Sequence, residues 1–270
     1  MFYLWLAVFG CMSGISAVLF GFGGGFVVVP LLYRMLLSGH GADDAVAQSA
    51  MHIAVATSTC VMIVNALMAT GKHRRAGNLI RHYLWPLGGY IGLGAIAGAV
   101  LAMAVSGEAM RYAFIAYLAL TIADCLMRRG FLEQSDTRAP RCLGRLENTG
   151  GLGIGAIATF LGVGGSVMTV PLLRRCGLSM TQATSMANPL SVPVALAGTL
   201  TYMAMAGFSR FDLGPWFIGY IDLLAFAVLT LGSLLGMRLA SPWIGRIPDR
   251  LHARVYIGLL VLVMLGMLVR

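Results

Sequence analysis

Charged residues are scarce in this sequence. They make up 11% of the 270 residues, against 59% hydrophobic residues, and the mean hydropathy is +0.84. A soluble domain needs a more polar surface than this, so the composition excludes that class. The sequence therefore predicts an all-α polytopic membrane protein, with the lipid bilayer as a partner. Four apolar runs are near or above the length that crosses a bilayer: residues 83–105, 112–127, 215–237 and 255–269.

Acidic residues are the rarer of the two charged kinds, ten against 19 Lys and Arg, which gives a formal net charge of +9. A net positive charge can indicate nucleic-acid binding. Here the basic residues lie in short loops between apolar spans, as is typical of the cytoplasmic loops of membrane proteins. We therefore predict no nucleic-acid partner.

The sequence also lacks the motifs of several enzyme classes. It contains no G-x-x-x-x-G-K-[ST], so it encodes no ATP-driven pump. Its five cysteines are odd in number and form no C-x-x-C pair, which argues against a disulfide framework or a metal site. A membrane enzyme would need a cluster of His, Asp, Glu or Cys at depth, and the chain offers only scattered single residues. We predict no catalytic residue, no metal and no cofactor.

Glycine, in contrast, is abundant, with 35 residues, and two clusters of it share one motif. Residues 21–32 read GFGGGFVVVPLL, and residues 162–173, which lie 141 positions later, read GVGGSVMTVPLL. Such clusters would break a membrane helix near mid-depth, where lipid cannot pair the exposed peptide groups, so a break must be buried in protein or line a wet cavity. The apolar run after each cluster predicts a helix, and the free N–H groups at its start are suited to an anion.

A second motif supports an internal duplication, because Ala56-Thr57-Ser58 matches Ala183-Thr184-Ser185 in the same order along the chain. The one long polar segment, residues 128–148, divides the chain into a first transmembrane repeat at 1–127 and a second at 149–270. Each half contains about five helical elements. Five is an odd number, so the second half enters the membrane from the opposite side. This predicts two inverted repeats, with glycine-broken helices near the midplane.

The basic residues provide a test of this topology. If residues 71–82 are cytoplasmic, ten crossings also place residues 128–148, 174–180 and 238–254 in the cytoplasm. These four segments hold 15 of the 19 Lys and Arg residues. The asymmetry favours inverted repeats with both termini outside and makes residues 128–148 a cytoplasmic linker. Eight spans with both termini inside stay open, if each broken pair of elements crosses once.

Paired glycine-broken segments in the two halves of a membrane protein indicate a transporter's substrate site. We therefore predict that both breaks bind a small anionic substrate, although close helix packing is the alternative role of such glycines. Packing is the role that we expect for Gly88, Gly92, Gly94 and Gly98. The third predicted helix of each half, residues 45–70 and 180–206 (the third elements), adds hydroxyls and an amide. Hydroxyls in membrane helices often bond only to the preceding turn, and an Asn before a Pro marks a helix distortion. The predicted substrate-binding residues are Gly23, Gly24, Gly25, Gly164, Gly165, Ser166, Thr57, Ser58, Thr184, Ser185 and Asn188.

Two ionisable residues, His52 and Asp222, lie several residues inside apolar runs. An ionisable group inside a membrane span is costly, so it indicates a function by default. We expect both to take part in proton coupling. For His52, a hydrogen-bonded position at the membrane interface is the alternative.

The duplicated G-x-G-G-[GS]-x(3)-V-P-L-L, each copy followed by A-T-S, resembles the sulfite exporter TauE/SafE family of membrane transporters. The resemblance covers both halves, and the second copy departs from the first in carrying Ser166 where the first carries Gly25. It implies a multi-pass protein of the cell inner membrane, not an enzyme, that acts as a secondary transporter and exporter of sulfite, a sulfonate or another small anion. An integral-membrane enzyme and a membrane scaffold or assembly factor are the alternatives, and substrate flux in proteoliposomes separates the first function from both.

Overall fold

The computed structural model describes residues 2–39, 41, 44–127, 131–132, 143–145, 149–206 and 215–268. Nearly all of these residues are helical, which confirms the predicted all-α class. In the first half the helices are α1 (Phe2–Phe20), α2 (Gly25–Gly39), the short α3 (Ala45–Gln48), α4 (Ala50–Arg75), the 3₁₀ turn η1 (Arg81–Tyr83), α5 (Leu87–Ala104) and α6 (Gly107–Met127). In the second half they are α8 (Gly151–Leu161), α9 (Ser166–Arg175), α10 (Met180–Ala206), α11 (Leu223–Ala240), the 3₁₀ turn η2 (Ser241–Trp243) and α12 (Asp249–Leu268). Two short antiparallel strands, β1 (Phe217–Ile218) and β2 (Ile221–Asp222), precede α11.

Six helical segments in the described ranges are long and apolar enough to cross a membrane: Tyr3–Phe20, Ala50–Arg75, Arg81–Ala104, Gly107–Met127, Leu223–Trp243 and Asp249–Leu268. The protein is therefore a multi-pass membrane protein. Helices α2, α8 and α9 are short, and they adjoin the two glycine clusters. Helix α10 has 27 residues, enough to span a bilayer, but its middle carries polar side chains.

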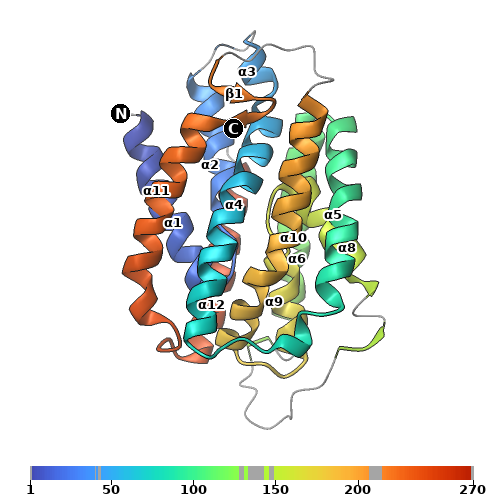
Figure 1. Ribbon diagram of the computed structural model, residues 1–270, viewed down its shortest axis with the longest axis vertical. Coiled ribbons are helices and arrows are strands. Elements are labelled where there is room, and N and C mark those ends of the chain that lie inside the picture. The colour runs from blue at the N-terminus through green and yellow to red at the C-terminus, as the bar shows by residue number, and fades with distance from the viewer. Residues whose placement is uncertain are drawn as a thin grey trace.

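The long helices run roughly side by side, with the turns after α4, α9 and α11 at one end of the bundle and both termini toward the other end (Figure 1). Basic residues gather at the end with these turns, because Arg74 and Arg75 close α4, and Arg174 and Arg175 close α9. The sequence predicts this arrangement, with the basic segments on one side of the membrane and both termini on the other. Of the predicted linker at 128–148, the described residues are 131–132 and 143–145.

Glycine brings two helix pairs into backbone contact, α1 with α11 and α5 with α8. A Cβ atom on Gly14 of α1 or on Gly236 of α11 would overlap a main-chain carbonyl of the facing helix, and the same holds for Gly98 of α5 and Gly155 of α8. Small residues four apart allow such close approach in membranes. The predicted packing role is confirmed for Gly98, and for Gly94, which meets α8 in the same way.

Helices α4 and α10 pack against each other in the centre of the bundle, with α2 on α4 and α9 on α10. Their polar side chains are fully buried: Thr57, Ser58, Thr59 and Asn65 on α4, and Thr184, Ser185, Asn188 and Ser191 on α10. Because lipid cannot pair polar groups, helices with this composition take the protein-lined positions, and the uniformly apolar helices surround them.

Candidate functional site

Both glycine clusters interrupt helices, as predicted. Helix α1 ends at Phe20 and α2 begins at Gly25, while α8 ends at Leu161 and α9 begins at Ser166. Left-handed backbone makes the first turn possible, because φ is +74° at Gly21, +62° at Gly23 and +91° at Gly24. In the second break, Gly162 is the one residue with such a conformation, with φ at +68°.

The two breaks touch each other between α4 and α10. A Cβ atom placed on Gly25 would lie 2.5 Å from the carbonyl oxygen of Gly162. Gly23 and Gly164 face the same two side chains, since a Cβ on either would lie about 3 Å from Met62 Sδ of α4 (3.1 and 2.9 Å) and next to Ser191 of α10. Segments 141 positions apart in the sequence therefore form one site.

The main-chain N–H groups after each break have no hydrogen-bond acceptor among the described residues. In the first break, Gly21 donates to Ala17 O and Val28 donates to Gly24 O, and no bond begins at the N–H groups of residues 22–27. In the second, no bond begins at those of residues 164–167. Nearly all of these residues are buried. Buried N–H groups are almost always paired in proteins, so this set marks a place for an acceptor.

Two of the predicted residues also have a buried side-chain oxygen with no partner among the described residues. These oxygens are Ser166 Oγ, on the first residue of α9, and Asn188 Oδ1 of α10. The Asn188 amide nitrogen donates to Thr184 O at 3.4 Å, within its own helix. The residues predicted for the site thus include one free hydroxyl donor at the start of α9. Sequence reasoning named both residues.

The other predicted hydroxyls differ in what they contact. Ser58 Oγ reaches the second break and donates to Gly162 O at 3.0 Å. Thr184 Oγ1 bonds back to Met180 O in the preceding turn, and Ser185 Oγ donates to Asn78 O outside the breaks. Thr57 Oγ1 accepts a bond from the Asp222 main-chain nitrogen at 3.0 Å. Ser58 therefore contacts the second break, while Thr57 and Ser185 connect α4 and α10 to segments outside the breaks.

The start of α4, which carries His52, and the β1–β2 hairpin, which ends at Asp222, lie toward the end of the bundle that carries the termini, away from the breaks (Figure 1). The Asp222 carboxylate caps α11 by accepting from the Ala225 N–H at 2.9 Å. The expectation that Asp222 lies inside a span is wrong in its placement, because the β1–β2 hairpin occupies the first part of the apolar run and α11 begins only at Leu223. His52 Nε2 lies 3.2 Å from both Ala102 O and Val105 O, and its ring is near that of Tyr220.

A network that sequence reasoning missed supports the first break. Ser13 Oγ of α1 donates to Gly24 O at 2.9 Å, and Asn65 of α4 joins Ser13 to Ser233 of α11 through its two side-chain atoms, at 3.4 and 2.6 Å. The Asn65 amide lies directly against the Gly24 backbone. An asparagine inside the apolar third element was the only signal for this network in the sequence.

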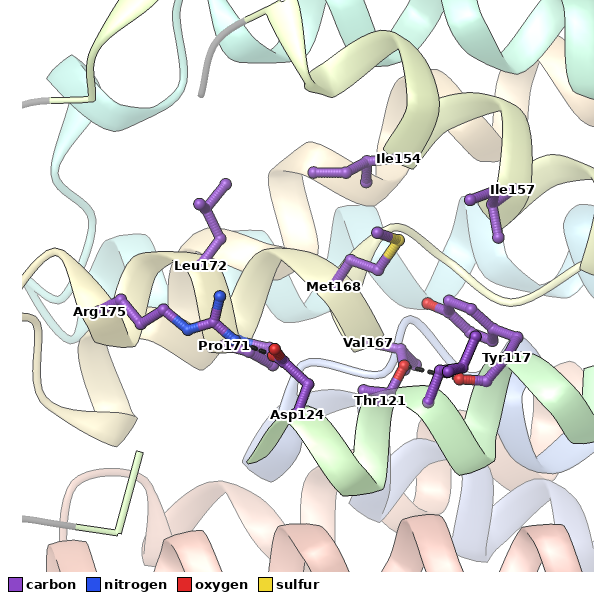
Figure 2. A pocket seen from close by; sticks show the side chains of 11 residues that line it. Tyr117, Thr121, Asp124, Ile154, Ile157, Val167, Met168, Pro171, Leu172 and Arg175 are labelled. Atoms are coloured by element: carbon purple, nitrogen blue, oxygen red, sulfur yellow. Dashed lines mark hydrogen bonds and ion pairs between the residues drawn. The ribbon is translucent and has the colours of Figure 1, made fainter. Parts of the chain in front are cut away.

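A cavity of about 460 Å³ lies beside α9. Figure 2 shows its lining by α6, α8 and α9, with the ion-paired Asp124 and Arg175 at one end and Tyr117 at the other. Its wall is mostly apolar, and it meets the site at Val167, one residue into α9. The cavity is therefore a neighbour of the second break, separate from the contact between the two breaks.

The chain is similar to known proteins along nearly its whole length. Residues 6–267 match the family described as Sulfite exporter TauE/SafE. A protein of Haemophilus influenzae (strain ATCC 51907 / DSM 11121 / KW20 / Rd), named "Probable membrane transporter protein", is 23% identical over 272 residues, which cover 100% of this chain and 99% of that protein. No solved structure matches the chain.

Proposed function

The chain belongs to the sulfite exporter TauE/SafE family, and on this premise we propose that it is a secondary transporter that exports a small anion, such as sulfite or a sulfonate, bound between the two helix breaks. The observation that carries this proposal is the set of N–H groups at residues 22–27 and 164–167, nearly all buried, that have no acceptor in the described part of the chain. These groups precede or begin α2 and α9, so the partial positive charges of two helix starts meet at one place.

The described side chains that contact the glycines of the breaks carry no charge. Met62, Ser191 and Ser58 are all neutral, so backbone dipoles and hydroxyls provide the attraction for an anion. Such a site holds an anion without a fixed cation that would retain it strongly, which suits a protein that must release its substrate on the other side.

Enclosure of the breaks fits alternating access. Residues 20–26 and 161–167 are all buried, so an anion bound between them is shut off from both aqueous sides. Release then requires movement of one part of the bundle against another, as inverted-repeat transporters do.

Crossed helix packing supports two inverted repeats, residues 1–127 and 149–270. The glycines that pack α1 on α11 and α5 on α8 recur at fixed offsets: Gly10 and Gly14 match Gly151 and Gly155 at 141 positions, and Gly94 and Gly98 match Gly232 and Gly236 at 138. The first helix of each half therefore packs on the fourth helix of the other half. A two-fold axis between the halves predicts such reciprocal helix contacts.

We place the protein in the cell inner membrane with its basic turns in the cytoplasm, because Lys and Arg gather at one end of the bundle. A single cysteine at position 78 in a cysteine-free background tests this orientation. It should resist a membrane-impermeant maleimide added to intact cells, and ready labelling from outside would reverse the orientation.

Flux in proteoliposomes tests the proposed function. The purified protein should exchange radiolabelled sulfite or methanesulfonate across the membrane, and protein-free liposomes should not. Methanesulfonate and dimethyl sulfone have nearly the same size and differ in charge, so they form a matched pair of competitors. Methanesulfonate should compete and dimethyl sulfone should not. Absence of flux for both anions, or equal competition by the sulfone, would overturn the proposal.

A further inference from the structure

Two buried histidines hold the end of α1, directly before the first break. His73, near the end of α4, has its Nε2 atom 2.8 Å from Val18 O, and His252, in the first turn of α12, has its Nε2 atom 2.8 Å from Leu19 O. The side chains are 1% and 3% exposed. A carbonyl oxygen can only accept, so Nε2 carries the hydrogen in each ring. The lone pair of the neutral ring is then on Nδ1.

Both Nδ1 atoms are buried and have no hydrogen-bond partner among the described residues. The two histidines line one small cavity of about 10 Å³, together with Val18, Leu19, Thr181, Thr184 and the η2 segment that includes Trp243. A space of this size holds about one water molecule. Two histidines whose Nδ1 atoms have no partner among the described residues therefore line a single buried space.

We propose that His73 and His252 form a proton-binding pair and that its protonation state is coupled to movement of the first break; the coupling rests on the transport function proposed above. The end of α1 favours the proton, because a helix C-terminus carries partial negative charge. A cationic ring also strengthens its bond to the carbonyl that it already holds. Protonation thus ties the end of α1 more firmly to α4 and α12.

Burial and mutual repulsion both oppose a second charge, so the pair holds at most one proton. Each imidazolium would repel the other, so the two rings titrate as one coupled unit. Asp249 of α12 and Arg174 of α9, the charged residues near His252, form an ion pair with each other, so their charges largely cancel. One proton gained or lost beside the break is the amount that a proton-coupled transporter needs for each step.

Among the residues that the structure describes, the second break has no counterpart of this pair. Its last-turn carbonyls, at Ala158 and Thr159, accept from the main-chain N–H groups of Val163 and Gly162. Backbone bonds of this kind do not titrate. Protonation therefore changes the contacts of the first break and leaves the backbone bonds of the second break unchanged.

Fluorescence of Trp243 tests the proton site without any substrate. The other three tryptophans, Trp5, Trp85 and Trp216, are replaced by Phe, and emission is measured against pH in detergent. Because a cationic imidazole quenches a neighbouring indole, emission should fall as pH decreases between about 8 and 5. Glutamine keeps an N–H donor near the Nε2 position and does not titrate, so His73→Gln with His252→Gln should abolish the change. His82→Gln, at an exposed position, is the matched control. A flat wild-type curve, or an unchanged curve in the double variant, would overturn the proton site.

Proteoliposomes test the coupling. Methanesulfonate stays an anion throughout this pH range, so only the protein titrates. A pH gradient should drive its accumulation by the wild type, and the double Gln variant should exchange it without responding to the gradient. A gradient response in the double variant would overturn the coupling and leave transport intact. A normal fluorescence titration without any methanesulfonate or sulfite flux would instead contradict the proposed function and leave the proton-binding pair standing.

Discussion

The two helix breaks have nearly the same sequence, yet different groups hold them in place. In the first, side chains from three helices hold the chain: Ser13 bonds to Gly24 O, and His73 and His252 bond to the last carbonyls of α1. In the second, the backbone closes the end of α8 by itself, and Ser58 adds one bond to Gly162 O. The two similar segments therefore share free N–H groups at the matching positions 23–26 and 164–167, while different groups hold each segment in place.

The difference extends to the glycines themselves. Gly24 has φ at +91°, and a Cβ there would overlap the Asn65 amide and lie 2.8 Å from Ser13 Oγ. Gly165 has φ at −60°, and the nearest atom to a Cβ there, Ile154 Cγ2, is 3.5 Å away. The geometry thus strains any side chain at position 24 and leaves room for one at position 165. Four experiments follow, in order of decreasing expected effect.

The largest effect is expected at the two helix contacts that glycine makes possible, α1 with α11 and α5 with α8, because the two halves of the chain are alike there. Gly14→Leu in α1 and Gly155→Leu in α8 would each drive a side chain into a main-chain carbonyl, of Ser233 and Ile91 respectively. Backbone cannot move aside cheaply, so each change should cost more than about 3 kcal/mol and leave little folded protein. The yield of monodisperse protein by size-exclusion chromatography measures this. Gly153→Leu, on α8 with no atom within 4 Å, is the control. A large loss for one interface and none for the other would contradict the two-fold relation.

The second effect separates the breaks. Gly24→Ala should leave a folded protein whose binding of methanesulfonate is at least about 10-fold weaker, since left-handed backbone costs a non-glycine residue about 1–2 kcal/mol and Asn65 must also shift. Equilibrium binding on purified protein gives the value. Gly77→Ala is the control, because φ there is +74° in open space, so it carries the strain without the contact. Wild-type binding by the Gly24→Ala variant would mean that the first break is not part of the site.

A smaller effect is expected from the network under the first break. Ser13→Ala removes the donor to Gly24 O, and a hydrogen bond of this kind contributes about 1 kcal/mol, which corresponds to roughly 5-fold in affinity. The matching position in the second half, 141 residues later, is Ile154, so the second break has no such bond to lose. Ser16→Ala, which removes a bond within α1 only, is the control and should bind methanesulfonate normally. Equal losses for Ser13→Ala and Ser16→Ala would show that the effect belongs to α1 in general.

Much of this arrangement could be predicted from the sequence, because it depends on composition and local spacing. Glycine density indicated both breaks, and the polar residues of the third elements were predicted to join them, as Ser58 does at the second break. The rest depends on tertiary contacts. His73 was assigned to a basic loop because Arg74 and Arg75 follow it, whereas α4 continues to Arg75 and buries the ring. Asp222 was placed inside a span because a hairpin of apolar residues resembles a helix in hydropathy.

The backbone conformation of each glycine could not be predicted from the sequence either. A substitution that tests this conformation has the smallest expected effect of the four experiments. The sequence treats Gly24 and Gly165 as equivalent members of one motif, but Gly165 has a right-handed conformation that any residue can adopt. Gly165→Ala should therefore fold with unchanged or slightly higher thermal stability, since alanine restricts the unfolded chain more than glycine does. Binding of methanesulfonate should stay within about 2-fold of the wild type, which is about 0.4 kcal/mol. Measured beside Gly24→Ala in the same assay, this variant decides whether the breaks differ as the geometry indicates. A loss as large as that of Gly24→Ala in a folded protein would contradict the difference, because the space at Gly165 would then be needed by the anion itself.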